Sequence, residues 1–80
     1  MLPLYGFLEG DALGLVILAE EHETVGALAD KLREAAKMRV ASSGPLAVWY
    51  RGQRLDPTVL LADSGIEPLE RFDVRRADPG

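Results

Sequence analysis

Two apolar stretches at the start of the chain predict a β-hairpin. Residues 2–9 are rich in leucine and aromatic residues, and residues 12–19 form a second apolar stretch. Between them stands Gly10-Asp11, a two-residue turn signal, because glycine at the first turn position suits a type II′ turn. The two strands are therefore expected to pair directly across Gly10-Asp11.

A change to helical spacing follows the acidic stretch 20–23. Val25, Leu28, Leu32 and Ala36 recur at intervals of three and four residues, and Thr24 before them is a suitable N-cap. This pattern predicts one helix from about residue 24 to residue 38. We expect its residues Val25, Leu28 and Leu32 to face a core made of Leu4, Leu15, Ile17, Val48, Phe72 and Val74.

The second half of the chain predicts short strands joined by turns. Residues 46–50 form a clear strand, residues 53–55 a short return strand and residues 72–76 a last strand. Residues 58–66 are expected to be irregular or a short helical turn, with Gly65 at positive φ. The order β-β-α-β-(β)-β predicts an α+β domain, a mixed sheet of four to five strands packed on one helix, with the first and last strands side by side. This is the order of the β-grasp fold. We assign residues 1–76 to a single domain and residues 77–80 to a flexible tail.

Both faces of the predicted hairpin are apolar. Pairing across Gly10-Asp11 places Leu2, Leu4, Leu8, Leu13, Leu15 and Ile17 on one face, and Pro3, Tyr5, Phe7, Val16 and Leu18 on the other. A single helix covers only one face. Trp49 joins the second set if its neighbours Val48 and Tyr50 turn toward the core. Scattered exposed apolar residues are ordinary, but a contiguous patch marks a docking surface. We therefore predict a partner-binding surface made of Tyr5, Phe7, Val16, Leu18 and Trp49.

Composition limits the classes of function. A chain of 80 residues holds one domain and leaves little room for an active-site cleft with its supporting residues. The absence of cysteine excludes disulfides, thiol catalysis and thiolate metal sites, and it fits a cytoplasmic location. The formal net charge of −4 argues against nucleic-acid and anionic-membrane partners. No apolar run reaches the length of a membrane span.

The residues capable of chemistry do not form a site in the sequence. His22 is the only histidine, and a solvated loop is the preferred interpretation of its acidic surroundings, because no second histidine or cysteine completes a metal site. Ser64 lacks the Gly-x-Ser-x-Gly context of a nucleophile. We expect no enzyme activity, no catalytic residue, no cofactor and no metal. Five arginines could form a basic patch, although a salt-bridged surface fits the thirteen acidic residues better: Arg51, Arg54, Arg71, Arg75 and Arg76.

Two segments carry a resemblance to known families. The element order and Arg51-Gly52-Gln53-Arg54-Leu55 resemble ubiquitin-like proteins. The stretch Leu-Leu-Ala-Asp-Ser-Gly-Ile-Glu-Pro at 60–68, followed by Phe-Asp-Val at 72–74, resembles the small gamma subunit (system protein B) of bacterial toluene monooxygenases. This resemblance implies a non-catalytic β-grasp subunit of an aromatic-hydrocarbon hydroxylase. Its partners would be the larger hydroxylase subunits, and the diiron centre would belong to the alpha subunit.

Two other classes of protein remain open from the sequence. A ubiquitin-like modifier or sulfur carrier would be activated at Gly80, but Pro79 stands where such proteins have the first glycine of a Gly-Gly pair. A ubiquitin-like adaptor, such as those associated with type VII secretion, shares the style of Asp63-Ser64-Gly65-Ile66. Activation of Gly80 by an adenylating enzyme would distinguish the modifier, and the neighbouring genes would distinguish the adaptor.

Overall fold

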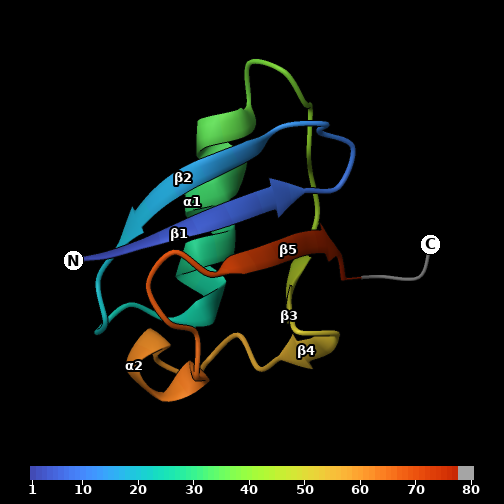
Figure 1. Cartoon of the computed structure of the whole chain (residues 1–80). Coiled ribbons are helices and arrows are strands. Elements are labelled where there is room, and N and C mark those ends of the chain that lie inside the picture. The colour runs from blue at the N-terminus through green and yellow to red at the C-terminus, as the bar shows by residue number, and fades with distance from the viewer. Residues whose placement is uncertain (78–80) are drawn as a thin grey trace.

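A computed structural model of the chain describes residues 1–77 and contains one sheet and two helices (Figure 1). Along the chain the elements are β1 (Leu2–Leu8), β2 (Gly14–Ala19), α1 (Val25–Ala36), β3 (Leu46–Tyr50), β4 (Gln53–Leu55), α2 (Leu61–Ser64) and β5 (Arg71–Arg76). The strands stand in the order β2-β1-β5-β3-β4. In the middle of the sheet β1 runs parallel to β5, whereas the other neighbours are antiparallel. The predicted mixed sheet, with the first and last strands side by side, is confirmed.

The N-terminal hairpin keeps the predicted register but has a wider turn. Pairing runs from Leu2 opposite Ala19 to Phe7 opposite Gly14 and stops there. The Asp11 amide donates to the Leu8 carbonyl at 2.9 Å, which closes a turn with Gly10 at φ 92°. The predicted two-residue turn at Gly10-Asp11 is therefore wrong.

The side chain of Asp11 explains the wider turn. Its carboxylate accepts from the Leu13 amide at 3.1 Å and forms an ion pair with Arg39 of 2.6 Å. A short polar side chain that binds a nearby amide competes with strand pairing. Leu13, which was expected on the core face, consequently lies before β2 and is 56 % exposed.

Helix α1 covers one face of the sheet and encloses the core (Figure 1). The Thr24 hydroxyl accepts from the Ala27 amide at 3.1 Å, which confirms the predicted N-cap. Two further amides at this end, those of Val25 and Gly26, donate to carbonyls of the segment before α2. Val25, Leu28 and Leu32 are fully buried and share one apolar cluster with Leu4, Ile17, Val48, Phe72 and Val74, with Leu15 packed at its margin. The predicted core is confirmed.

The chain stays attached to the sheet beyond β5. The Ala77 amide donates to the Pro45 carbonyl at 3.0 Å, which continues the pairing of β5 with the β3 side. Residues 78–80, the remainder of the predicted tail and the site of Gly80, lie outside the described residues.

Candidate partner-binding surface

The face of the sheet opposite α1, here called the outer face, exposes apolar side chains on β1 and β2. In the register of the sheet, Val16 of β2 lies opposite Tyr5 of β1, and Leu18 lies opposite Pro3. Val16 and Leu18 are each 54 % exposed, and Tyr5 is 43 % exposed. We call Tyr5, Val16 and Leu18 the apolar patch. Strand alternation puts these side chains on the side that the helix does not cover.

Phe7 and Trp49 lie on the same face but are half-buried under arginines. The Phe7 ring lies against Gly14, and the guanidinium carbon of Arg71 stands 4.0 Å from its centroid. Above the Trp49 ring, the guanidinium carbon of Arg75 stands 5.1 Å from the centroid. A cation over an aromatic face is attracted by the ring quadrupole, so each arginine is held over its ring.

Strand β5 divides the outer face into two parts. Its outward residues Arg71, Asp73 and Arg75 stand between the apolar patch and Trp49, because β5 lies between β1 and β3. Arg71 pairs with Asp73 at 2.9 Å. All five predicted surface residues thus share one face, as the strand alternation indicated. They form an apolar part on β1 and β2 and an aromatic part covered by arginine toward β3.

The five arginines do not form one basic patch. Arg54, Arg71 and Arg75 lie on the outer face, whereas Arg76 lines a pocket at the end of the sheet. Arg51 is paired with Glu70 at 2.7 Å. The two ion pairs, Arg51 with Glu70 and Arg71 with Asp73, agree with the interpretation of a salt-bridged surface.

Glu70 holds the segment before β5 against the end of β3. Its carboxylate accepts hydrogen bonds from the Tyr50 hydroxyl, the Glu67 amide and the Arg51 guanidinium. These three donors stabilise the charged form and lower the pKa of Glu70 to about 2, with Tyr50 the largest cause. The same carboxylate raises the pKa of Tyr50. The network fixes the position at which β5 begins, and with it the position of Arg71.

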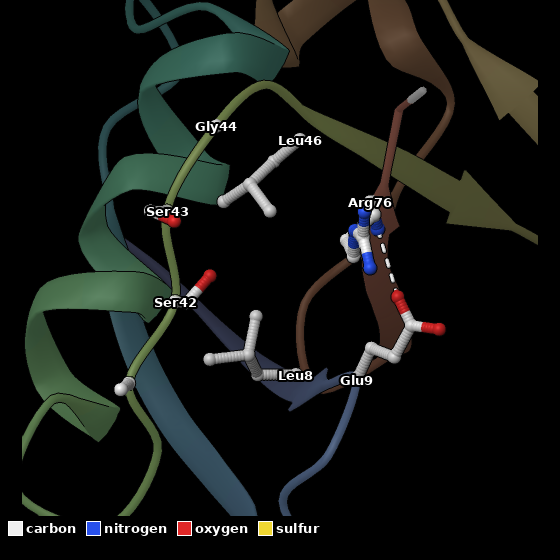
Figure 2. A pocket seen from close by; sticks show the side chains of 8 residues that line it. Leu8, Glu9, Ser42, Ser43, Gly44, Leu46 and Arg76 are labelled. Atoms are coloured by element: carbon white, nitrogen blue, oxygen red, sulfur yellow. Dashed lines mark hydrogen bonds between the residues drawn. The ribbon is translucent and has the colours of Figure 1, made fainter. Parts of the chain in front are cut away.

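The pocket in Figure 2 lies between the end of β1, the end of β5 and the loop after α1. It has a volume of about 430 Å³. Its apolar lining is Leu8, Ala41 and Leu46, and the hydroxyls of Ser42 and Ser43 are on its loop side. The Glu9 carboxylate accepts from the backbone amide of Arg76 at 2.9 Å. None of the residues predicted from the sequence as partner-binding lines this pocket.

Two residues considered for chemistry have other surroundings. His22 is exposed in the turn between β2 and α1, and residues 1–77 contain no group of three His, Asp or Glu placed to hold a metal ion. The Ser64 hydroxyl donates to the Leu61 carbonyl at 2.8 Å and accepts from the Ile66 amide at 3.2 Å, so it closes the end of α2. Gly65 follows at φ 86°, as predicted. Within the described part of the chain, no helix is long and apolar enough to cross a membrane.

Leu69 is an exposed apolar residue that the sequence analysis missed. It is 62 % exposed, and its amide donates to the Pro3 carbonyl at 2.6 Å, beside the start of β1. Its φ of 68° is unusual for a leucine. No local pattern predicts this conformation, because it depends on the pairing of residues 69 and 3.

Comparison with known proteins places the chain in a family. The model of the family described as "Toluene-4-monooxygenase system protein B (TmoB)" matches residues 1–75. The chain belongs to the toluene-4-monooxygenase system protein B family. The resemblance read from residues 60–74 is thereby confirmed. Family membership supports an accessory role beside a monooxygenase, and no curated protein sequence matches the chain.

Solved structures agree with the family on the fold. A chain of "Toluene 4 monooxygenase HD Complex with Inhibitor 4-Bromobenzoate" superposes with a TM-score of 0.87 at 23 % identity, covering 94 % of this chain and 96 % of that one. "Caldiarchaeum Subterraneum Ubiquitin" superposes with a TM-score of 0.74 at 20 % identity, covering 99 % and 96 %. The system protein B chain therefore has the ubiquitin-like β-grasp fold predicted from its sequence.

Proposed function

We propose that this system protein B chain is the non-catalytic, gamma-type subunit of a multicomponent diiron monooxygenase hydroxylase that acts on aromatic hydrocarbons. It acts by binding the larger hydroxylase subunits. The observation that supports this role most strongly is the family match over residues 1–75, almost the whole chain. The chemistry belongs to the partner subunits, and this chain contributes a rigid surface to the assembly.

The outer face supports the mode of binding. Burial of the apolar patch by a partner stabilises the complex by roughly 25 cal/mol for each Å² removed from water. Toward β3, the surface presents Arg71 and Arg75 over aromatic rings, with Arg54 opposite Trp49. A partner that matches this face carries apolar side chains against the apolar patch and carboxylates near the arginines.

The leucines of the chain offer a matched test of this surface. Leu18 and Leu13 are exposed to nearly the same extent, at 54 % and 56 %, but only Leu18 lies in the apolar patch. Both Leu18→Ser and Leu13→Ser should change the free energy of unfolding by no more than about 0.5 kcal/mol. We expect Leu18→Ser and Tyr5→Ser to reduce copurification with coexpressed larger hydroxylase subunits, and Leu13→Ser to leave it unchanged.

This experiment also tests the function itself. If the wild-type chain fails to copurify with the larger hydroxylase subunits, the proposed function is wrong. If it copurifies but all three serine variants bind alike, the function stands and the apolar patch is not the surface.

Trp49 tests the other part of the outer face. Because Trp49 points away from the core, Trp49→Ala should leave the chain folded and weaken assembly by about 2 kcal/mol if the ring is an interface anchor. A pull-down and a thermal melt on the same variant separate binding from stability. If the variant is unfolded, or if it folds and binds as well as wild type, Trp49 is not part of the partner-binding surface.

A further inference from the structure

Strand β2 forms one of the two edges of the sheet, and it is the longer one. The strand order leaves β2, with six residues, and β4, with three, each with a neighbour on one side only. In Figure 1, β2 is the outermost strand, next to β1 and in front of α1. An edge strand presents backbone N–H and C=O groups that its own sheet does not satisfy.

The hydrogen bonds of β1 show which residues of β2 form the open edge. The amides of Tyr5 and Glu9 donate to carbonyls on the β5 side, at 3.0 and 2.8 Å. The backbone N–H and C=O groups of the odd-numbered residues of β1 therefore point toward β5. The backbone groups of the even-numbered residues of β1 consequently form the hydrogen bonds with β2. In the observed register their partners are Leu15, Ile17 and Ala19.

Gly14, Val16 and Leu18 therefore point their backbone groups away from the sheet. The hydrogen bond from Lys31 Nζ of α1 to the Leu18 carbonyl, at 3.0 Å, agrees with this direction. Among the hydrogen bonds that residues 1–77 make, none involves the amide of Leu18 or the outward groups of Val16 and Gly14. The open edge thus presents alternating donors and acceptors at the spacing of a strand.

This edge lacks the usual protection against pairing. Proteins block exposed edges with prolines, charged side chains on the strand, bulges or very short strands. The sequence of β2, Gly-Leu-Val-Ile-Leu-Ala, contains neither proline nor charge. Lys31 covers only the end at Leu18, and its ammonium is also held by Glu23 at 2.6 Å.

We propose that β2 pairs along this edge with an extended segment of a larger hydroxylase subunit, which adds a sixth strand to the sheet. In the free chain water satisfies these exposed groups, and another extended backbone can replace that water along the whole row, because its own N–H and C=O groups alternate at the same spacing. Strand addition of this kind is a common mode of peptide recognition. The inference rests on the proposed function and deepens it, because it names the structural element through which the partner binds.

Charge and side-chain size define the segment further. The loop that follows β2 carries two exposed glutamates, of which Glu20 forms an ion pair with the Met1 ammonium at 3.6 Å. The carboxylate of Glu21 adds a negative charge at that end, which a lysine or arginine of the segment would match. On the helix, Ala27 and Ala35 lie four residues before and after Lys31, on the same side. These small side chains leave room for the inward side chains of the segment. Its outward side chains extend the apolar patch beside Val16 and Leu18.

Hydrogen exchange measured by NMR tests the proposal amide by amide in the full chain. In the free chain, the amides of Val16 and Leu18 should exchange fast, whereas those of Leu15, Ile17 and Ala19 are bonded to β1 and serve as slow controls. Binding of the larger hydroxylase subunits should slow the Val16 and Leu18 amides by about tenfold or more. Fast exchange at both positions in a formed complex overturns the proposal while leaving the proposed function intact.

Two variants at Val16 separate the contribution of the backbone amide to partner binding from that of the side chain. Val16→Pro removes the outward donor and puts a ring at the edge, where proline does not break a bond to β1. Val16→Thr keeps the amide and the branched shape. We expect Val16→Pro to bind about tenfold more weakly than Val16→Thr. Equal affinities overturn the proposal. If Val16→Pro does not fold, the exchange of the wild-type amides decides.

The remaining outcomes are also decisive. A free chain that self-associates, with a slow Val16 amide before any partner is added, assigns the edge to a second copy and overturns the proposal. A wild-type chain that forms no complex with the larger subunits refutes the proposed function and this inference together.

Discussion

Substitution by alanine should lower the stability of the fold by very different amounts at Gly6 and at Gly14, although an added Cβ would clash at both sites. At Gly6 in β1, an added Cβ would lie 2.6 Å from Cζ of Phe72 and 3.0 Å from both terminal carbons of Leu32. At Gly14 in β2, it would lie 2.4 Å from Cζ of Phe7. By distance alone Gly14→Ala is the worse substitution, but the surroundings of the two sites reverse this order.

Gly6→Ala should be clearly destabilising, because its neighbours cannot move. Phe72 and Leu32 are fully buried in the core between the sheet and α1. Overpacking of this kind costs about 1–3 kcal/mol, and the lower entropy of alanine in the unfolded chain returns only about 0.4–1 kcal/mol. The middle of each range gives a net loss of about 1.3 kcal/mol, which corresponds to a Tm lower by roughly 5–10 °C for a domain of this size.

Gly14→Ala should cost less than about 1 kcal/mol, because Phe7 lies half-buried on the outer face and can rotate toward solvent. The rotation would break the contact of Phe7 with Arg71. Urea and thermal unfolding of both variants beside wild type measure the difference. If Gly14→Ala is destabilised as much as Gly6→Ala, the outer face is packed as rigidly as the core and the reasoning is wrong. A stable Gly14→Ala with weaker binding would support Phe7 as a surface residue.

Two further predictions concern the loss of stability at low pH and the effect of deleting the last three residues. The pKa of Glu70 is lowered from 4.5 to about 2 in the folded chain, so its stabilising contribution is fully present above about pH 4.5 and is lost as the pH falls toward 2. Glu70→Gln should therefore melt lower than wild type at pH 7, and the difference should shrink toward pH 2; a difference independent of pH would contradict this. Deletion of residues 78–80 should preserve the melting curve and partner binding, because the sequence of this segment offers no apolar anchor and the segment lies beyond the last strand, β5. Loss of function in this deletion would instead favour a conjugating or sulfur-carrying role at Gly80.

The sequence by itself determined the elements, their order and most of the core. These features depend on local rules: Thr24 caps the helix, Val25, Leu28 and Leu32 recur at its period, and β1 and β2 alternate with period two. The alternation also placed Tyr5, Phe7, Val16, Leu18 and Trp49 on one face. The prediction that a partner binds there remains a prediction.

Only the tertiary structure decided how these residues are grouped. The wide turn after β1 combines a local hydrogen bond, from the Leu13 amide to the Asp11 carboxylate, with an ion pair between Asp11 and Arg39, 28 residues away. Leu69 reaches the start of β1 through a bond to Pro3, and β5 separates Trp49 from the apolar patch. The open edge of β2 likewise follows from the strand order. Contacts between distant segments form only when the whole sheet assembles, so no local periodicity encodes them.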